Sequence, residues 1–231
     1  MQGDQPVRKI IACVQLFLFV FVFGCGGMMT PPPPLTFKQP PTKPFGHALA
    51  IGRFTDKSFA RYSLFITGSD LQDLFQYELE RNRVFMNVSA VHIGKKDDRR
   101  AIEEKALERK ANLIMEGELT ESVCRFVGSN ELGIPMYLLI GSVLGFPLGF
   151  NIKAQTWQGG AEVIYRIRDI KTEKVLLARR VQAVAYRNFS IWEERTERQT
   201  NKNFVRRMLT PLVLQNLKTA VVQDIATNFK D

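Results

Sequence analysis

The first 25 residues constrain this chain most, because they determine the compartment in which the rest has to fold. Arg8 and Lys9 precede an apolar run, residues 10–23, which ends at the small residue Gly24. Two cations followed by about a dozen apolar residues and a small residue are typical of a secretory signal rather than of a globular segment. The sequence therefore predicts that residues 1–24 are a leader and that the remainder crosses a membrane.

The residue after Gly24 is a cysteine, and Val22 lies three positions before it. This arrangement resembles the bacterial lipobox, whose cysteine is acylated on sulfur and becomes the first residue of the mature protein. The resemblance implies a lipid anchor at Cys25, to which each acyl chain contributes about 0.8 kcal/mol of membrane affinity per buried CH₂. Gly26 follows, where an aspartate would retain an enteric lipoprotein at the inner membrane, so the expected location is the periplasmic face of the outer membrane. An uncleaved anchor and plain secretion are the alternatives, although the apolar run is short beside the about 20 residues that a span needs.

Charge and cysteine content limit the partners of the mature chain. Removing residues 1–24 leaves 30 basic against 22 acidic side chains, a net charge of +8. A basic exported protein is attracted to anionic lipid head groups, lipopolysaccharide or acidic protein surfaces, and we expect no nucleic-acid partner. With Cys13 in the leader and Cys25 acylated, Cys124 lacks a partner for a disulfide or a cysteine metal site.

A proline-rich tract separates the leader from the rest of the chain. Seven of the eleven prolines lie between Pro31 and Pro44, a composition typical of stiff polyproline II. We therefore expect residues 25–45 to be a lipidated cysteine with a linker that holds a domain, residues 46–231, off the membrane. A ligand for a proline-recognition module is the alternative.

Hydrophobic periodicity in residues 46–231 predicts strands alternating with helices. Strands are expected over residues 48–54, 84–91, 113–127, 161–169 and 175–186. Helices are expected after Ser69, which with Gln72 has capping-box spacing, over residues 99–111 with Asp98 as cap, and from Thr210-Pro211. The residues expected on the buried helix faces are Leu71, Leu74, Phe75 and Leu79, then Ile102, Ala106, Leu107 and Ala111, and last Leu214, Leu217, Val221 and Ile225. The order predicts an α/β (α+β) domain with a single mixed sheet of about five strands and two to three helices.

Three segments resemble a group of bacterial envelope lipoproteins. The first is the strand and turn of residues 48–58, and the second is a helix that ends at residues 110–112 before the strand from Leu113. The third is a strand–turn–strand in which Asp169 is followed by Thr172 and then by Val175-Leu176. These features resemble the domain of the curli-secretion lipoprotein and of the lipoprotein activators of penicillin-binding proteins, a domain similar to the amino-terminal domain of TolB and to anticodon-binding domains.

That resemblance covers residues 46–128 and 158–228 and implies a function. It implies a non-enzymatic assembly or scaffold protein, oligomeric or bound to another envelope protein, with no catalytic residues to carry over. A regulator that docks a cell-wall synthase is the first alternative. A hydrolase whose dispersed site leaves no motif is the second.

Residues 132–152 contain no charged side chain and are the main departure from that group. Pro135, Gly141 and Pro147 interrupt the segment, which disfavours a transmembrane helix. We expect an apolar hairpin that projects between the third and fourth strands and contacts lipid or a protein partner. Packing into the domain's own core and a true span are the alternatives. The candidate contact residues are Met136, Tyr137, Leu138, Leu139, Ile140, Val143, Leu144, Phe146, Leu148 and Phe150.

The remaining polar motifs do not predict a chemical site. His47 and His92 are the only histidines and neither has ligand spacing, so no metal or cofactor is expected. The pairs Glu103-Glu104 and Asp97-Asp98 are expected to be solvated surface. Arg179-Arg180 interrupts an apolar strand, which indicates a protected edge strand or an inward-pointing arginine.

Overall fold

The computed structural model describes residues 44–58, 63–91, 99–129, 153–190 and 201–229. Eight elements follow one another along these residues: β1 (Phe45–Asp56), α2 (Gly68–Arg81), β2 (Phe85–Ala90), α3 (Arg99–Glu108), β3 (Leu113–Ser129), β4 (Lys153–Asp169), β5 (Val175–Ser190) and α7 (Asn201–Asn228). The predicted order of strands and helices is confirmed.

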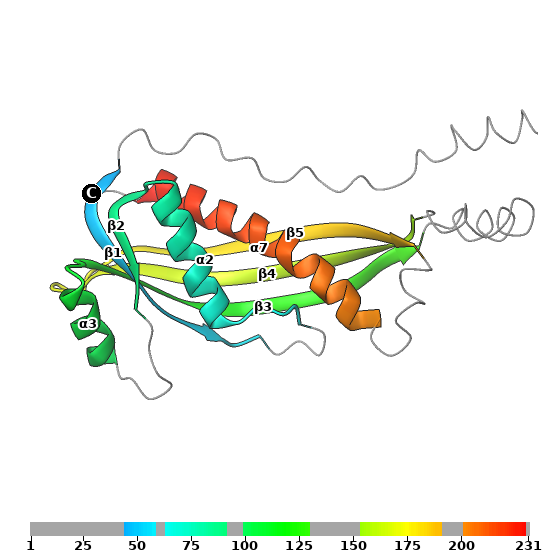
Figure 1. The fold of residues 1–231 in the computed structure, drawn as a ribbon, viewed down its shortest axis with the longest axis horizontal. Helices are drawn as coiled ribbons and strands as arrows, with labels where there is room; N and C mark the ends of the chain where they lie inside the picture. Colours follow the sequence, from blue (N-terminus) through cyan, green and yellow to red (C-terminus); the bar gives the residue numbers. More distant parts are fainter. Residues whose placement is uncertain (1–43, 59–62, 92–98, 130–152, 191–200, 230–231) are drawn as a thin grey trace, which may run out of the picture.

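One mixed sheet contains all five strands, in the order β2-β1-β3-β4-β5 (Figure 1). β1 is parallel to β2 and β3, because α2 and α3 provide the crossovers that parallel strands require. β3, β4 and β5 are antiparallel and form a long meander. The predicted single mixed sheet with three helices is therefore correct.

The helices divide unequally between the two faces of the sheet. α2 and α7 cover one face, and the main hydrophobic core lies between them and all five strands (Figure 1). Within this core Tyr165 is fully buried, and its hydroxyl donates a hydrogen bond to the Asp224 carboxylate on α7. Burial, and then this carboxylate, raise the pKa of Tyr165 far above its ordinary value. α3 covers only one end of the opposite face, where Ile102 and Ala106 pack in a second, smaller cluster.

The start of α2 differs from the prediction by two residues. Thr67, not Ser69, is the N-cap, and its hydroxyl accepts the backbone N–H of Asp70 while the Asp70 carboxylate accepts the Thr67 N–H. Gln72 is instead buried, and its side-chain amide donates to the carbonyls of Ile51 (3.0 Å) and Val91 (2.6 Å). The predicted capping box was therefore wrong, because Gln72 connects the helix to the middle of β1 and to the residue that follows β2.

α3 is shorter than the predicted helix over residues 99–111. It ends at Glu108, and Lys110 follows in the left-handed conformation with a φ of 60°. Ile102 and Ala106 are buried as expected, but Leu107 is 46% exposed and Ala111 is buried beyond the end of the helix. Asp98, the expected cap, lies outside the described residues.

Asn112, which follows this turn, joins three segments. Its side-chain carbonyl accepts the Ala48 N–H at 2.8 Å, and its backbone N–H donates to the Ala48 carbonyl at 3.0 Å. Its own carbonyl accepts the N–H of Ile170 at 2.9 Å. The segment 110–112 that contributed to the family resemblance therefore ends a helix and aligns β1 with β3, which is an architectural role.

β4 and α7 both begin earlier than predicted. β4 starts at Lys153 rather than at residue 161, and β5 extends to Ser190. α7 starts at Asn201, so Pro211 lies inside it. Thr210 is therefore not a cap: its hydroxyl donates to the Arg206 carbonyl (2.7 Å) and accepts the backbone N–H of Phe65 (3.2 Å). Leu217, Val221 and Ile225 are buried as expected, whereas Leu214 is half-buried.

β5 is at the edge of the sheet, and Arg179 and Arg180 are both exposed there. Arg180 lies 3.6 Å from the Glu162 carboxylate on β4. The interpretation of this arginine pair as part of a protected edge strand is consistent with that position, because charged side chains discourage pairing with another chain.

Candidate functional site

The groups that are chemically most reactive in a protein do not come together in the described ranges. No three His, Cys, Asp or Glu side chains in those ranges could hold a metal ion. Cys124 is a free thiol buried against α7, and this burial raises its pKa, which reduces its reactivity. The Nδ1 atom of His47 lies 2.7 Å from the side-chain nitrogen of Asn112. His47 therefore belongs to the contacts around Asn112 that align β1 with β3.

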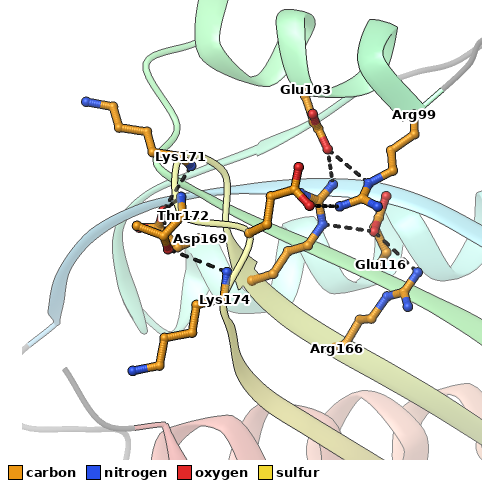
Figure 2. A network of polar contacts seen from close by, with 10 residues as sticks. Arg99, Glu103, Glu116, Arg166, Asp169, Lys171, Thr172 and Lys174 are labelled. Carbon is orange, nitrogen blue, oxygen red and sulfur yellow. Dashed lines mark hydrogen bonds and ion pairs between the residues drawn. The ribbon is translucent and has the colours of Figure 1, made fainter.

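The densest polar cluster joins α3 to the sheet, and Figure 2 shows it. Arg168 on β4 is only 3% exposed, with Nη2 2.7 Å from the Glu103 carboxylate and Nε 3.4 Å from that of Glu116. Arg166 lies 3.8 Å from the same Glu116 carboxylate, and Arg99 pairs with Glu103 at 3.1 Å. Arg168 Nη1 has no hydrogen-bond partner, and the contact of Nη2 with Glu103 lacks hydrogen-bond geometry. Two carboxylates compensate the buried charge, which indicates a role in holding α3 against the sheet.

Glu103 therefore differs from the prediction of a solvated surface, whereas its neighbour Glu104 is exposed as expected. The carboxylate of Glu103 is 20% exposed and links Arg168 to Arg99. Sequence analysis missed this role because the partner on β4 is 65 residues away along the chain. The available signal was a carboxylate on the same side of a helix as Ile102 and Ala106.

The β4–β5 turn explains the Asp169–Thr172 spacing in physical terms. The Asp169 carboxylate accepts the backbone N–H groups of Lys171 (2.9 Å) and Thr172 (2.8 Å) and the Thr172 hydroxyl (3.0 Å) (Figure 2). These bonds, the Thr172 N–H first, lower the pKa of Asp169 below its ordinary value. The motif closes a hairpin, so this part of the family resemblance describes the fold.

Replacing Asp169 by Ala should lower the melting temperature at neutral pH by roughly 2–6 °C, because three hydrogen bonds of the turn are lost. The folded-state pKa is lowered, so the stabilisation is complete above the unfolded value of 3.8 and is lost as the pH falls through the folded value. Thermal denaturation followed by circular dichroism should show the two proteins converging in acid. Asp73→Ala, at an exposed carboxylate on α2, is the control and should melt like the wild type at every pH.

A hollow of about 350 Å³ lies beside α3, on the sheet face that this helix covers only in part, and Ile102 of α3 borders it. Arg53, Glu116, Glu118 and Arg166 contribute side chains to its lining. The Glu118 carboxylate is 2.8 Å from Lys57, and Glu116 is held by Arg166 and Arg168. Each carboxylate thus has a cationic partner, and the arrangement offers an ion-paired surface rather than an acid–base pair.

Further along this face, polar side chains bond across the strands. Glu162 accepts hydrogen bonds from Gln182 and from Thr120 (2.7 Å), and these two bonds lower its pKa. Arg125 donates to the Gln158 side chain at 2.7 Å, and Thr156 donates to that of Asn188 at 2.8 Å. These groups satisfy one another, so the shifted pKa of Glu162 has a structural cause.

The residues predicted to make contacts lie outside the described residues: Cys25, and Met136, Tyr137, Leu138, Leu139, Ile140, Val143, Leu144, Phe146, Leu148 and Phe150. The structure does place both flanks of the 130–152 segment. β3 and β4 remain paired up to Ser129 and Gln155, and Lys153 pairs with Ser190 on β5. The segment is thus inserted between the third and fourth strands, at the end of the sheet farthest from the start of β1 (Figure 1).

None of the helices in the described part of the chain is long and apolar enough to cross a membrane.

Comparisons with known proteins add no family assignment. The sequence matches no protein-family model and no curated protein. Among solved structures, a PelC dodecamer from Paraburkholderia phytofirmans is 11% identical with a TM-score of 0.32, over 80% of this chain and 96% of that one. A minor lipoprotein from Acinetobacter baumannii is 14% identical with a TM-score of 0.39, over 80% and 95%. The LpoB C-terminal domain from Salmonella enterica is 8% identical with a TM-score of 0.34, over 61% and 84%. At these identities and TM-scores the likeness carries no argument about family or task.

Proposed function

We propose that this chain is a lipid-anchored envelope protein that works without catalysis, as an assembly or scaffold factor. It is held through Cys25 at the periplasmic face of the outer membrane and contacts another envelope protein or copies of itself. The leader, the lipobox-like junction and the proline-rich linker support the anchoring.

One structural observation carries the non-catalytic part of the proposal. The polar clusters of the described residues are engaged in structural pairs: Arg168 with Glu103 and Glu116, the Asp169 turn, and the Glu162 hydrogen bonds. The pKa of Asp169 is shifted by the turn and that of Glu162 by its hydrogen bonds, whereas the pKa of Tyr165 is shifted by burial and by the Asp224 carboxylate on α7, so the three shifts arise in different parts of the sheet. A catalytic site brings perturbed groups together in one cavity, and these groups are dispersed.

The charge-free segment 132–152 supplies the contact surface in this proposal. The described part of the core between the sheet, α2 and α7 is built from residues of these elements. In this proposal the apolar side chains of the segment contact a partner or a bilayer, where buried apolar area contributes about 25 cal/mol per Å².

Changing Leu139 and Phe146 together to Asp should abolish this association while leaving the melting temperature nearly unchanged. Affinity purification of tagged wild type and double variant from detergent-solubilised membranes, compared by mass spectrometry, provides the measurement. Lys171→Asp with Lys174→Asp, at exposed positions in the β4–β5 turn, is a matched control that should retain the partners. A fall in melting temperature of the Leu139 and Phe146 variant would instead show that the segment is core, and the contact proposal would fail.

A further inference from the structure

Charge is distributed unevenly along the long axis of the domain. Four stretches contain no Asp or Glu: residues 123–129, 153–161, 181–190 and 201–216. The cations in these stretches are Arg125, Lys153, Arg187, Lys202, Arg206 and Arg207. We call these four described stretches the acid-free end; the segments that join them outside the described residues contain Glu131, Glu193, Glu194 and Glu197.

The structure brings the four stretches together. Arg125 is paired with Gln158 and Trp157 with Arg187 across the sheet. The start of α7 packs on the same strands, with the Phe189 and Phe204 rings 6.0 Å apart. Phe45, where the linker joins the domain, is instead 4.9 Å from Phe229, beyond the last turn of α7. The linker junction at Phe45 and the acid-free end therefore lie at opposite ends of α7, which has 28 residues and is about 42 Å long (Figure 1).

The arginines on the α7 side of this end have no carboxylate partner among the described residues. Arg207 is exposed on α7. Arg206 lies 4.0 Å above the Phe65 ring, and Arg187 lies 5.4 Å from the centre of the Phe189 ring. Elsewhere on the sheet Arg166, Arg168 and Arg180 lie beside glutamates. Within the described ranges, no carboxylate therefore competes with an external anion for these arginines of the acid-free end.

Exposed apolar side chains accompany these cations. Phe126 is 48% exposed and Leu212 39%, and Phe65, on the loop beside α7, is 45% exposed. Phe65 also borders a shallow hollow of about 440 Å³ with Arg207, Pro211 and Leu214. Trp157 is half-buried against Phe126, with ring centres 5.5 Å apart. Aromatic rings together with arginines are the side chains that occupy the interface between lipid head groups and acyl chains.

We propose that the acid-free end is a docking surface for an anionic phospholipid bilayer, separate from the lipid anchor at Cys25. Phosphate head groups complement the unpaired arginines, and the exposed Phe65, Phe126 and Leu212 enter the boundary with the acyl chains. An acidic protein is the alternative, because arginine and aromatic side chains also occupy protein interfaces, and the test distinguishes the two occupants. Residues 26–44, if extended as their prolines predict, span about 60 Å, which exceeds the length of α7 and lets both attachments reach a membrane surface.

The test uses the mature-length chain with Cys25→Ala, so that no acyl chain contributes to binding. Co-sedimentation with vesicles of phosphatidylcholine, with and without phosphatidylglycerol, measures the partition coefficient. The chain should bind the anionic vesicles and be released by high salt, because salt screens exposed charges. Adding Arg187→Gln and Arg207→Gln should reduce binding to anionic vesicles about thirtyfold, as expected for two cations near the surface.

The matched control removes two exposed cations from the opposite end, Lys171→Gln and Lys174→Gln. This variant should bind nearly as well as its parent. An equal loss in both variants would show attraction by net charge alone and would overturn the assignment. Equal binding to zwitterionic and to anionic vesicles would also overturn it. So would a chain that binds an acidic protein but does not bind anionic vesicles. Circular dichroism spectra of all variants establish that they fold alike, and failure here leaves the anchoring proposal intact because Cys25 is absent from every arm.

Discussion

Replacing Cys25 by Ala should move the protein almost completely from the membrane fraction to the soluble periplasmic fraction. The Cys25 sulfur is the atom to which the lipobox resemblance assigns the lipid, and one to three acyl chains at this residue contribute far more membrane affinity than a polar surface contact. The measurement is fractionation of cells after a high-salt wash, which removes proteins held by charge alone. The wild type should stay with the outer membrane through the same wash.

Cys124→Ala is the control for this experiment, because it removes the thiol that is buried in the domain. That variant should remain with the membrane fraction. If the Cys25→Ala protein still sediments with membranes after the wash, the lipid anchor is wrong, and an uncleaved leader becomes the better account.

Replacing Gly68 by Ala should destabilise the domain more than any other single methyl addition described here. Gly68 begins α2, and a Cβ built on it would lie 1.9 Å from the carbonyl oxygen of Phe54 and 2.9 Å from its carbonyl carbon. Both atoms are backbone of β1, so α2 or the strand has to move, which disturbs the packing of Phe54 on Phe75, whose rings are 5.2 Å apart. We expect a loss of about 3 kcal/mol or more in the free energy of unfolding, or roughly 6–12 °C in melting temperature.

Gly46→Ala is the matched control, because a Cβ on this exposed glycine of β1 would meet no atom within 4 Å. Thermal denaturation of the two variants beside the wild type separates the steric effect from the general effect of replacing glycine in this region. A change of less than about 2 °C for Gly68→Ala would mean that α2 does not lie against β1 as described.

The order of strands and helices could be predicted because periodicity is local. In β4 the alternation puts Val163, Tyr165 and Ile167 on one face of the strand, and all three are buried. The exact start of α2 could not be predicted, because Thr67 with Asp70 and Ser69 with Gln72 both have the spacing of a capping box. The choice depends on Gln72 reaching the carbonyls of Ile51 and Val91, which are contacts between distant parts of the chain.

The start of α7 illustrates a different limit. A proline after a threonine is typical of a first helical turn, which favoured Thr210-Pro211 as the beginning. The helix instead continues through Pro211, with Val205 and Leu209 buried in the preceding turns. Thr210 bonds to the Arg206 carbonyl and to the loop at Phe65, and this tertiary contact is not visible in a local pattern.

The candidate contact surfaces were predictable only in part. The charge-free segment 132–152 is evident from the sequence, whereas the acid-free end depends on the topology. Its four stretches are separated by tens of residues, and they become one surface only when β4 pairs with β3 and β5 and α7 packs on them. The Arg168–Glu103 pair likewise depends on the topology, because it forms where α3 packs on the other end of the sheet.

The central claim is that this domain acts by binding other molecules of the envelope rather than by chemistry. Size-exclusion chromatography with light scattering on residues 46–231, followed by capture from detergent-solubilised membranes, tests it most directly. The account predicts a defined oligomer, or a monomer that captures a specific envelope protein. If the captured protein is a cell-wall synthase, the synthase-docking alternative is the better description. A monomer that retains no envelope protein but turns over a cell-wall substrate would contradict the account.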